Sequence, residues 1–169
     1  MLFLYILIFL ILISVAYTTY SLAPWVPSFK KDFPRICNLA NFKENDKFYD
    51  LGCGNGSLVL YAGKYYPIKA IGLELSIPLY LFCKIKQIAA KNATFKFQNI
   101  LYANFSDADV VYLFPLWKNT IKKLKTKMET ELKRGTRVIT YTFPIEGWIP
   151  EKIDKPTDKD LSVYLYIIE

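Results

Sequence analysis

The chain has 169 residues, a formal net charge of +7 and no histidine. Its length is typical of one folded domain and too short for a large two-domain enzyme. The lack of histidine excludes a Ser-His-Asp triad, a Cys-His dyad and any zinc site with histidine ligands, and the three cysteines are too widely spaced to indicate a disulfide framework or a zinc ribbon.

The hydrophobic residues are concentrated at the N-terminus. No charged side chain occurs from Met1 to Phe29. A helix extending to Leu22 would be roughly 33 Å long at ~1.5 Å per residue, which matches a ~30 Å hydrocarbon core. We therefore predict a transmembrane anchor over residues 1–22. The alternative is a cleaved signal peptide, because Ser14-Val15-Ala16 resembles a cleavage site, although no basic residue precedes the apolar run.

The residues after the anchor predict its orientation. Lys30 and Lys31 are the first basic residues, and the positive-inside rule places them, and the domain that follows, on the cytoplasmic side. Residues 23–34 hold three prolines and three aromatic residues and are predicted to form an extended collar. The compact chain with its short N-terminal extension favours a prokaryotic inner membrane over a mitochondrial one.

Strands and helices are predicted to alternate along residues 35–169. Apolar runs and helical periodicity predict a short helix at 35–43, strands at 47–51, 68–73, 94–97, 109–114, 137–143 and 162–168, and helices at 56–65, 78–91 and 118–133. The polar stretch 150–160 is predicted to be a surface loop. This alternation predicts an α/β domain, Rossmann-like, with a mostly parallel sheet and helices on both of its faces.

A glycine-rich loop follows the first predicted strand. The sequence Asp50-Leu51-Gly52-Cys53-Gly54-Asn55-Gly56 lies where ligands bind in open α/β folds, at the carboxyl ends of the strands. A dinucleotide fingerprint would need glycine where Ser57 stands, and a phosphate-binding P-loop would need a following lysine. Glycine is also common in ordinary strand-to-helix turns, so the loop alone does not specify a ligand.

A second acidic residue narrows the choice of ligand. Glu74 ends the second predicted strand, where a carboxylate can accept hydrogen bonds from ribose hydroxyls. A solvated loop acid is the simpler interpretation of Glu74 taken alone. Together with Asp50 and the glycine loop, it favours a nucleoside ligand without a pyrophosphate.

These motifs resemble those of the class I, seven-strand, S-adenosylmethionine-dependent methyltransferases. The matching segments are YDLGCGNG at 49–56, GLELS at 72–76, FQNI at 97–100 and VVYLFP at 110–115. The resemblance implies that Asp50 and the backbone of Gly52 and Gly54 hold the methionine end of S-adenosyl-L-methionine, and that Glu74 holds its ribose. Asn99 stands where the family often has an acid that contacts the adenine amine, and its carbonyl oxygen can accept the same bond.

A narrower resemblance is to the membrane-anchored protein-lysine methyltransferases that modify the ATP synthase c-subunit and the adenine nucleotide translocase. Pro24-Trp25-Val26-Pro27-Ser28 resembles their P-[FY]-V-P-T motif, with Trp25 and Ser28 in place of the aromatic residue and the threonine. A proline-rich membrane collar would also explain this segment. The full set of cofactor-binding residues that the resemblance implies is Pro27, Ser28, Asp50, Gly52, Gly54, Asn55, Gly56, Glu74, Asn99 and Ile100.

A lysine acceptor sets few demands on the protein. Its amine, with an unperturbed pKa near ~10.4, must lose a proton, and an apolar pocket promotes that loss. Tyr112, Phe114 and Trp117 are candidates for lining such an acceptor channel, although Tyr112 and Phe114 could equally be ordinary strand packing. The Asn/Asp-Pro-Pro-aromatic motif of many nucleic-acid methyltransferases is missing, which argues against a nucleic-acid acceptor. The reaction requires no metal, and no further catalytic residue is identifiable.

The predicted helix at 118–133 is rich in lysine. Six lysines face only two acids, Glu129 and Glu131. This pattern is typical of a solvated helix face, but it is also compatible with attraction to anionic lipid headgroups or, less readily, to nucleic acid.

The sequence thus predicts a membrane-anchored methyltransferase that acts on a lysine of a membrane protein. Two alternatives stay open at this point. One is a methyltransferase for a lipid or quinone acceptor, and the other is a non-catalytic module with a cofactor fold that binds a membrane partner.

Overall fold

The structure is a computed structural model that describes residues 1, 4–6, 8–9, 12–13, 26–114 and 118–169. The helices are η1 (Lys30–Asp32), α2 (Phe33–Ala40), α3 (Ser57–Tyr65), α4 (Ile77–Gln87) and α5 (Lys118–Glu131). The strands are β1 (Lys47–Leu51), β2 (Lys69–Glu74), β3 (Ala93–Phe97), β4 (Val110–Leu113), β5 (Arg137–Tyr141), β6 (Lys152–Asp154) and β7 (Val163–Ile167). Six of these strands were predicted from the sequence.

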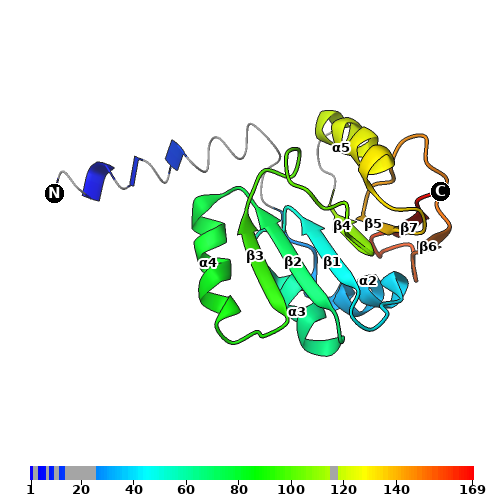
Figure 1. Cartoon of the computed structure of the whole chain (residues 1–169), viewed down its shortest axis with the longest axis horizontal. Helices are drawn as coiled ribbons and strands as arrows, with labels where there is room; N and C mark the ends of the chain where they lie inside the picture. The colour runs from blue at the N-terminus through cyan, green and yellow to red at the C-terminus, as the bar shows by residue number, and fades with distance from the viewer. Residues whose placement is uncertain (2–3, 7, 10–11, 14–25, 115–117) are drawn as a thin grey trace.

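Within the described residues, all strands form a single sheet (Figure 1). The strand order is β3-β2-β1-β4-β5-β7-β6. Strands β1 to β5 pair in parallel, and β7 is antiparallel to both β5 and β6. This arrangement confirms the predicted Rossmann-like, mostly parallel sheet.

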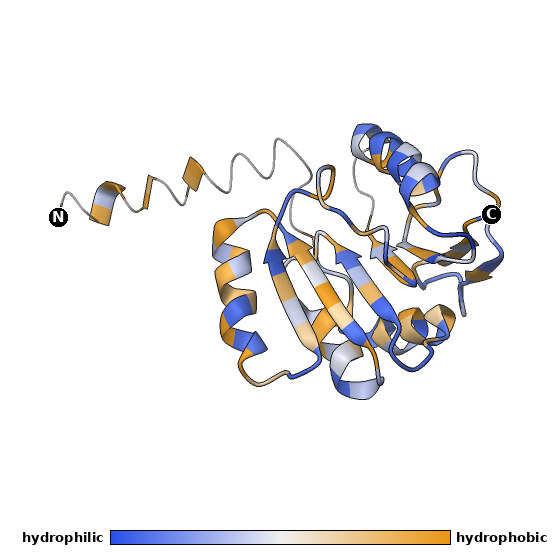
Figure 2. Cartoon of the chain, in the orientation of Figure 1, coloured by the Kyte–Doolittle hydropathy of each residue, from blue (hydrophilic) through white to orange (hydrophobic). Residues whose placement is uncertain are grey.

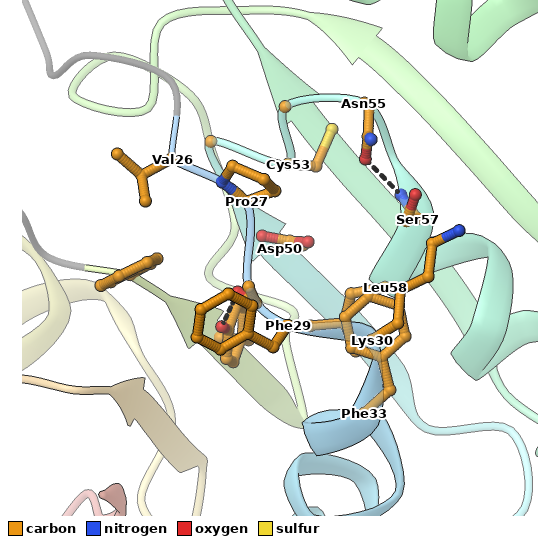
Figure 3. A pocket seen from close by; sticks show the side chains of 15 residues that line it. Val26, Pro27, Phe29, Lys30, Phe33, Asp50, Cys53, Asn55, Ser57 and Leu58 are labelled. Atoms are coloured by element: carbon orange, nitrogen blue, oxygen red, sulfur yellow. Dashed lines mark hydrogen bonds between the residues drawn. The ribbon is translucent and has the colours of Figure 1, made fainter. Parts of the chain in front are cut away.

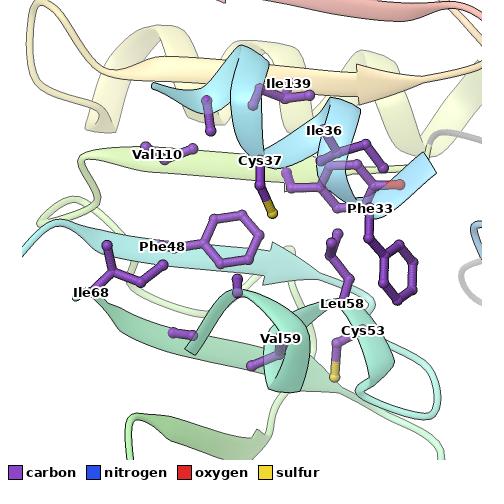
Figure 4. Packing of buried hydrophobic residues seen from close by; sticks show 14 of the residues in the cluster. Phe33, Ile36, Cys37, Phe48, Cys53, Leu58, Val59, Ile68, Val110 and Ile139 are labelled. Carbon is purple, nitrogen blue, oxygen red and sulfur yellow. The ribbon is translucent and has the colours of Figure 1, made fainter. Parts of the chain in front are cut away.

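The central strands are buried on both faces because apolar side chains alternate between two cores. On β1, Phe48 belongs to one core and Tyr49 to the other, as do Val110 and Val111 on β4. The first core packs against α2 and α3, whose apolar residues point at the sheet in Figure 4. The second core packs against α5, so helices cover both faces as predicted.

Helix α5 presents the predicted apolar stripe to the sheet. Leu124 and Met128 are buried, and Ile121 packs against the same core. Two of its lysines have polar partners, since Lys127 forms an ion pair with Glu131 and Lys125 donates a hydrogen bond to the carbonyl oxygen of Glu146. Figure 2 shows that the outer surface of this helix is mostly hydrophilic.

The sequence predictions differ from the structure at three places. The segment predicted as a surface loop at 150–160 contains the short edge strand β6, which has only three residues and no buried apolar side chain. The predicted fifth strand ends at Tyr141, because Thr142 adopts a φ of 72°. The predicted extended collar becomes helical at Lys30, and Pro34 stands in the first turn of α2, where its fixed φ is tolerated.

The predicted anchor lies mostly outside the described residues. Of residues 1–22, positions 2–3, 7, 10–11 and 14–22 are not described, and the first three residues of the collar are not either. No helix in the described part of the chain is both long and apolar enough to cross a bilayer. The transmembrane anchor therefore stays a prediction.

A buried polar network fixes the start of the domain against the far side of the sheet. Asp32 accepts hydrogen bonds from the hydroxyl of Tyr141 at 2.6 Å and from Arg35 at 2.9 Å. Arg35 also donates to the carboxylate and carbonyl oxygens of Asp154. These contacts join η1 and α2 to β5 and β6, and so they fix the position of the chain that immediately precedes Lys30.

Candidate active site

A cavity of about 270 Å³ opens at the carboxyl ends of β1 and β4 (Figure 3). Its walls come from the segment before α2, the end of β1, the glycine loop, the start of α3 and the end of β4. The lining residues are Val26, Pro27, Ser28, Phe29, Lys30, Phe33, Asp50, Gly52, Cys53, Gly54, Asn55, Ser57, Leu58, Tyr112 and Phe114. The cavity thus joins Pro27 and Ser28 to Asp50 and the start of the glycine loop, residues that the resemblance implied to share a cofactor.

The glycine loop turns tightly because several of its residues have positive φ. Gly52 has a φ of 89°, and its N–H and that of Cys53 both donate to the carbonyl oxygen of Leu73 on β2. This double contact holds the loop over the neighbouring strand. It brings backbone rather than side chains to the cavity wall, which allows a ligand to approach closely.

Gly56 ends the loop and is required for packing rather than for lining the cavity. It has a φ of 71°, and a Cβ added there would lie 2.6 Å from the ring of Phe95 and 2.9 Å from the sulfur of Cys83. Cys83 in turn donates to the carbonyl oxygen of Gly54 at 3.2 Å. The glycine loop therefore packs against Phe95 of β3 and Cys83 of α4.

Asp50 points into the cavity (Figure 3) from the carboxyl end of β1 and is only 4% exposed. Burial, and secondarily the charge of Glu74, raises the pKa of its carboxyl to about 8. No described residue donates a hydrogen bond to this carboxylate. A buried acceptor of this kind is costly unless something pairs with it, and a cationic group in the cavity would both pair with it and lower its pKa.

Glu74 lies beside the cavity but does not line it. One of its oxygens accepts the N–H of Gly54 at 2.8 Å, and the other accepts those of Leu75 and Ser76 at 2.9 and 2.7 Å. Burial raises the pKa of Glu74, and these three hydrogen bonds oppose that rise. The carboxylate therefore holds the glycine loop. The oxygen that accepts from Gly54 keeps acceptor capacity for a ribose hydroxyl, so the ribose role stays a prediction.

Tyr112 and Phe114 form the wall contributed by β4. The hydroxyls of Tyr112 and Ser28 are 2.5 Å apart, which ties the segment before α2 to the sheet. Burial, together with the nearby charge of Asp50, raises the pKa of Tyr112 well above its usual value. Phe114 packs edge-on against Tyr141 and lies nearly parallel to the half-exposed Phe143. Both side chains line the cavity and also pack in the sheet, and their role in an acceptor channel stays a prediction.

Three other predicted residues lie elsewhere. Asn99 accepts the N–H of Leu101 at 3.0 Å, and Ile100 is buried in the core beneath α5. Neither lines the cavity, and Trp117 lies outside the described residues. The predicted contact of Asn99 and Ile100 with adenine would have to be made outside the cavity, along the carboxyl ends of β2 and β3.

The sequence analysis missed several lining residues. They flank the predicted motifs and are Val26, Phe29, Lys30, Phe33, Cys53, Ser57 and Leu58. The signal that could have found the first four is Pro34, because a proline in the first turn of a helix marks where that helix begins. The segment just before such a start is fixed in position and could have been placed at the site.

The residues present fit S-adenosyl-L-methionine. Asp50 supplies a buried carboxylate for a cationic amine, and the positive-φ glycines allow the backbone to approach the ligand. The cavity is slightly smaller than the ~300–1,000 Å³ typical of ligand pockets. It is therefore large enough for only part of the cofactor, and the contacts of Glu74 and Asn99 with its adenosine end stay predictions.

Comparison with known proteins identifies the family. The model of the ANTKMT methyltransferase domain matches residues 50–152. The protein-lysine N-methyltransferase of Saccharolobus islandicus (strain REY15A) is 36% identical over 156 residues, covering 86% of this chain and 93% of its own. The mouse lysine N-methyltransferase of the ATP synthase c-subunit is 27% identical over 132 residues, covering 76% of this chain. This chain spans about half the length of the mouse protein, 52% of it.

A solved structure agrees with the fold and the cofactor. It is an RNA methyltransferase from Salinibacter ruber in complex with S-adenosyl-L-homocysteine, with a TM-score of 0.79 and 28% identity, covering 85% of this chain and 94% of its own. The seven-strand sheet, the cavity with its buried acid and these similarities lead to one conclusion. The chain belongs to the ANTKMT methyltransferase domain family and is an S-adenosylmethionine-dependent methyltransferase.

Proposed function

We propose that this enzyme transfers the methyl group of S-adenosyl-L-methionine to a lysine side chain of a membrane protein. The observation that carries the proposal is a cavity whose floor holds one buried acid, Asp50, and whose walls are mostly apolar and aromatic. Its curated relatives are named as lysine methyltransferases of proteins and of the ATP synthase c-subunit, which supports lysine as the acceptor.

The cavity wall favours the neutral form of an acceptor amine. When bound, the cofactor supplies an activated methyl group on a sulfonium, so the protein needs to orient the amine and keep it unprotonated. Phe29, Phe33 and Phe114 provide apolar surface, which disfavours a charged ammonium. Lys30 also lines the cavity and places a like charge near the entering lysine, with the same effect on its pKa.

The membrane part of the proposal rests on the first 22 residues. Their described apolar side chains are exposed, with Phe9 and Leu12 exposed by 62% and 61%. Figure 2 shows these described positions as hydrophobic. Exposure of so much apolar surface to water is unfavourable. A bilayer would bury this surface if the segment forms the predicted transmembrane helix. The basic residues Lys30 and Lys31 support a cytoplasmic location for the domain.

The proposed anchor would place the cavity close to the membrane surface. Val26, which lines the cavity, lies four positions after Leu22. Even a fully extended chain spans only roughly 14 Å over four residues. An acceptor lysine would therefore have to lie near the headgroups, which supports a membrane protein as substrate.

The test is a labelling experiment with three acceptor classes. Purified full-length enzyme is incubated with membranes and total RNA in the presence of cofactor carrying a tritiated methyl group. Protein, lipid and RNA are then separated and counted. We expect label in protein, on lysine by mass spectrometry. The RNA fraction matters because the similar Salinibacter structure is of an RNA methyltransferase.

Two variants control this experiment. Glu74→Ala should abolish most cofactor binding, measured by calorimetry, and most labelling with it. Glu44→Ala removes an exposed acid ahead of β1, at the opposite edge of the sheet, and should leave both unchanged. Label confined to lipid or to RNA would refute the lysine acceptor, and absence of cofactor binding by the wild-type enzyme would refute catalysis of any kind.

The location is tested separately by protease accessibility. With the domain on the cytoplasmic side, protease should cleave it in inside-out membrane vesicles and spare it in intact spheroplasts. Cleavage in spheroplasts would reject the proposed orientation. The intact mass of the purified protein tests the anchor itself. A mass that matches a chain beginning near Tyr17 would reject the anchor in favour of a cleaved signal peptide.

A further inference from the structure

Helix α4 is apolar on the face that points away from the sheet. Its inner side packs on β2 and β3 through the fully buried Cys83. The outer side carries Leu81 and Ile85, and Ile88 caps the C-terminus of the helix three residues later; these side chains are exposed by 54%, 68% and 88%. A helix that covers an α/β sheet normally has a polar outer face. In α4 these exposed apolar residues are interspersed with hydrophilic ones, as the colours of Figure 2 show.

The charges around this face are all positive. Residues 75–106 contain Lys84, Lys86, Lys91 and Lys96 and no acidic residue. The Nζ of Lys86 lies 4.2 Å from the centre of the exposed Phe82 ring, so its stem runs along apolar surface while its charge stays at the edge. Apolar side chains flanked by lysines are the composition of helices that lie in the interface of an anionic membrane.

Helix α4 is also part of the cavity's support. Lys86 donates to the carbonyl oxygen of Asn55 and Cys83 to that of Gly54, so the helix contacts the glycine loop directly. The helix begins at Ile77, just after the carboxyl end of β2, and Val26 lines the cavity at the carboxyl ends of β1 and β4. A bilayer that holds the proposed anchor would therefore meet the sheet at the edge where α4 starts.

We propose that the outer face of α4, formed by Leu81, Phe82, Ile85 and Ile88, lies in the headgroup region of an anionic bilayer. This inference rests on the membrane anchoring in the proposed function and adds a second point of attachment to it. Two attachments, the anchor and α4, prevent free rotation of the domain about the anchor. They fix the orientation of the cavity relative to the membrane surface, so that an acceptor lysine meets it at one height and angle.

The test uses a fluorescent label at a single introduced cysteine. The native cysteines Cys37, Cys53 and Cys83 are buried, so a label added to the folded protein should react mainly at the new site. Ile88→Cys carries the label on α4. Ile149→Cys is the matched control, because Ile149 is 93% exposed and precedes β6, at the opposite edge of the sheet from α4. Unlabelled wild type treated with the same reagent gives the background.

The full-length variants are placed in vesicles made of equal parts phosphatidylcholine and phosphatidylglycerol. Lipids with a nitroxide near the headgroup should quench the label at position 88 about twofold or more, with a blue shift of its emission. They should leave the label at position 149 unchanged. Ile85→Asp, added to the Ile88→Cys protein, should reduce the quenching because a charge replaces the most central apolar side chain.

Two outcomes would overturn the inference. One is a label at position 88 that stays as exposed to water as the label at 149. The other is a label that is shielded without lipid quenching and increasingly so at high protein-to-lipid ratio, which would assign this face to a second copy of the chain. Methyl transfer by the same variants is measured on native membranes, so that a lack of protein labelling with quenching intact counts against the proposed function alone.

Discussion

Asp50 and Tyr112 are register partners on the neighbouring parallel strands β1 and β4, and both side chains line the cavity. The hydroxyl of Tyr112 is held by Ser28, whereas none of the described residues donates to the carboxylate of Asp50. The pair places a titratable acid beside a fixed hydroxyl at the floor of an apolar pocket. Burial raises the pKa of both groups, and the charge of Asp50 adds to the rise at Tyr112.

The raised pKa of Asp50 predicts how stability depends on pH. In the folded protein this pKa is about 8, against an ordinary value of 3.8. Between these values the folded state keeps a proton that the unfolded state has released, so stability is lost as pH rises toward 8. Asp50→Asn should remove this loss. The wild type should lose on the order of 1–4 kcal/mol more than the variant between pH 5 and 9. Urea denaturation across this range is the measurement, and parallel curves for the two proteins would contradict the prediction.

The hydrogen bonds of Glu74 predict a structural role besides any contact with ribose. Glu74→Gln puts an amide nitrogen where one oxygen accepts backbone N–H groups, and so leaves a buried donor at Gly54 or at Ser76 without an acceptor. This should reduce the free energy of unfolding by about 1–3 kcal/mol. Glu44→Gln, at an exposed position, should change it little. Equal denaturation midpoints for the two variants would show that the contacts of Glu74 do not hold the loop.

Gly56 is predicted to be the least replaceable glycine of the loop. Gly56→Ala imposes a φ of 71° on alanine and also places its Cβ 2.6 Å from Phe95. Gly135→Ala is the matched control, since its φ is 85° and no atom lies within 4 Å of the added Cβ. The control should cost roughly 1–2 kcal/mol for backbone conformation, and Gly56→Ala should cost about 1–3 kcal/mol more for overpacking. Thermal denaturation compares them, and similar costs would mean that Phe95 moves aside freely.

The network around Asp32 predicts a difference between a buried and an exposed ion pair. Asp32→Ala leaves the buried hydroxyl of Tyr141 without its acceptor and removes one of the two carboxylates paired with Arg35, and should cost about 1–3 kcal/mol. The control is Lys31→Ala, at the residue before Asp32. It removes the exposed ion pair of Lys31 with Asp160 and should cost roughly 0–1 kcal/mol. Chemical denaturation of both variants tests this. A cost for Asp32→Ala as small as that of the control would exclude the network as a fixed point of the domain.

Thr142 is predicted to be a position where the native residue is not the most stable one. It has a φ of 72°, the N–H of Phe143 closes a three-residue turn onto the carbonyl oxygen of Tyr141, and no described group bonds its buried hydroxyl. A β-branched residue is strained there. Thr142→Gly should raise the free energy of unfolding by about 1 kcal/mol. Asn45→Gly is the control and should not raise the free energy of unfolding, because asparagine tolerates its φ of 67°. A lower free energy of unfolding for Thr142→Gly than for the wild type would show that Thr142 is not strained.

Much of the fold followed from the sequence because the inner strands are buried on both sides. Runs such as Val110 to Leu113 are apolar throughout and buried at every position. The edge strand β6 escaped prediction for the opposite reason. Lys152 and Ile153 are exposed, and the segment is recognisable as a strand only from its pairing with β7.

The site was predictable where its residues are neighbours in sequence. Asp50 and the glycines follow one another in one loop, and the structure places them together. The contacts that join distant segments were not visible. The hydroxyls of Ser28 and Tyr112 meet across 84 positions, and Asp32 and Tyr141 across 109. Nothing in the local pattern of either partner specifies the other, because such pairs depend on the order of strands in the sheet.

The short connection between the proposed anchor and Val26 has a consequence for kinetics. A cavity held within roughly 14 Å of the bilayer searches for its acceptor in two dimensions. An acceptor in the same membrane is then present at a high effective concentration, which for short tethers reaches the millimolar range. Weak intrinsic affinity for the acceptor would suffice under these conditions. A soluble peptide that carries the same lysine should accordingly be a poor substrate, even if every contact inside the cavity is preserved.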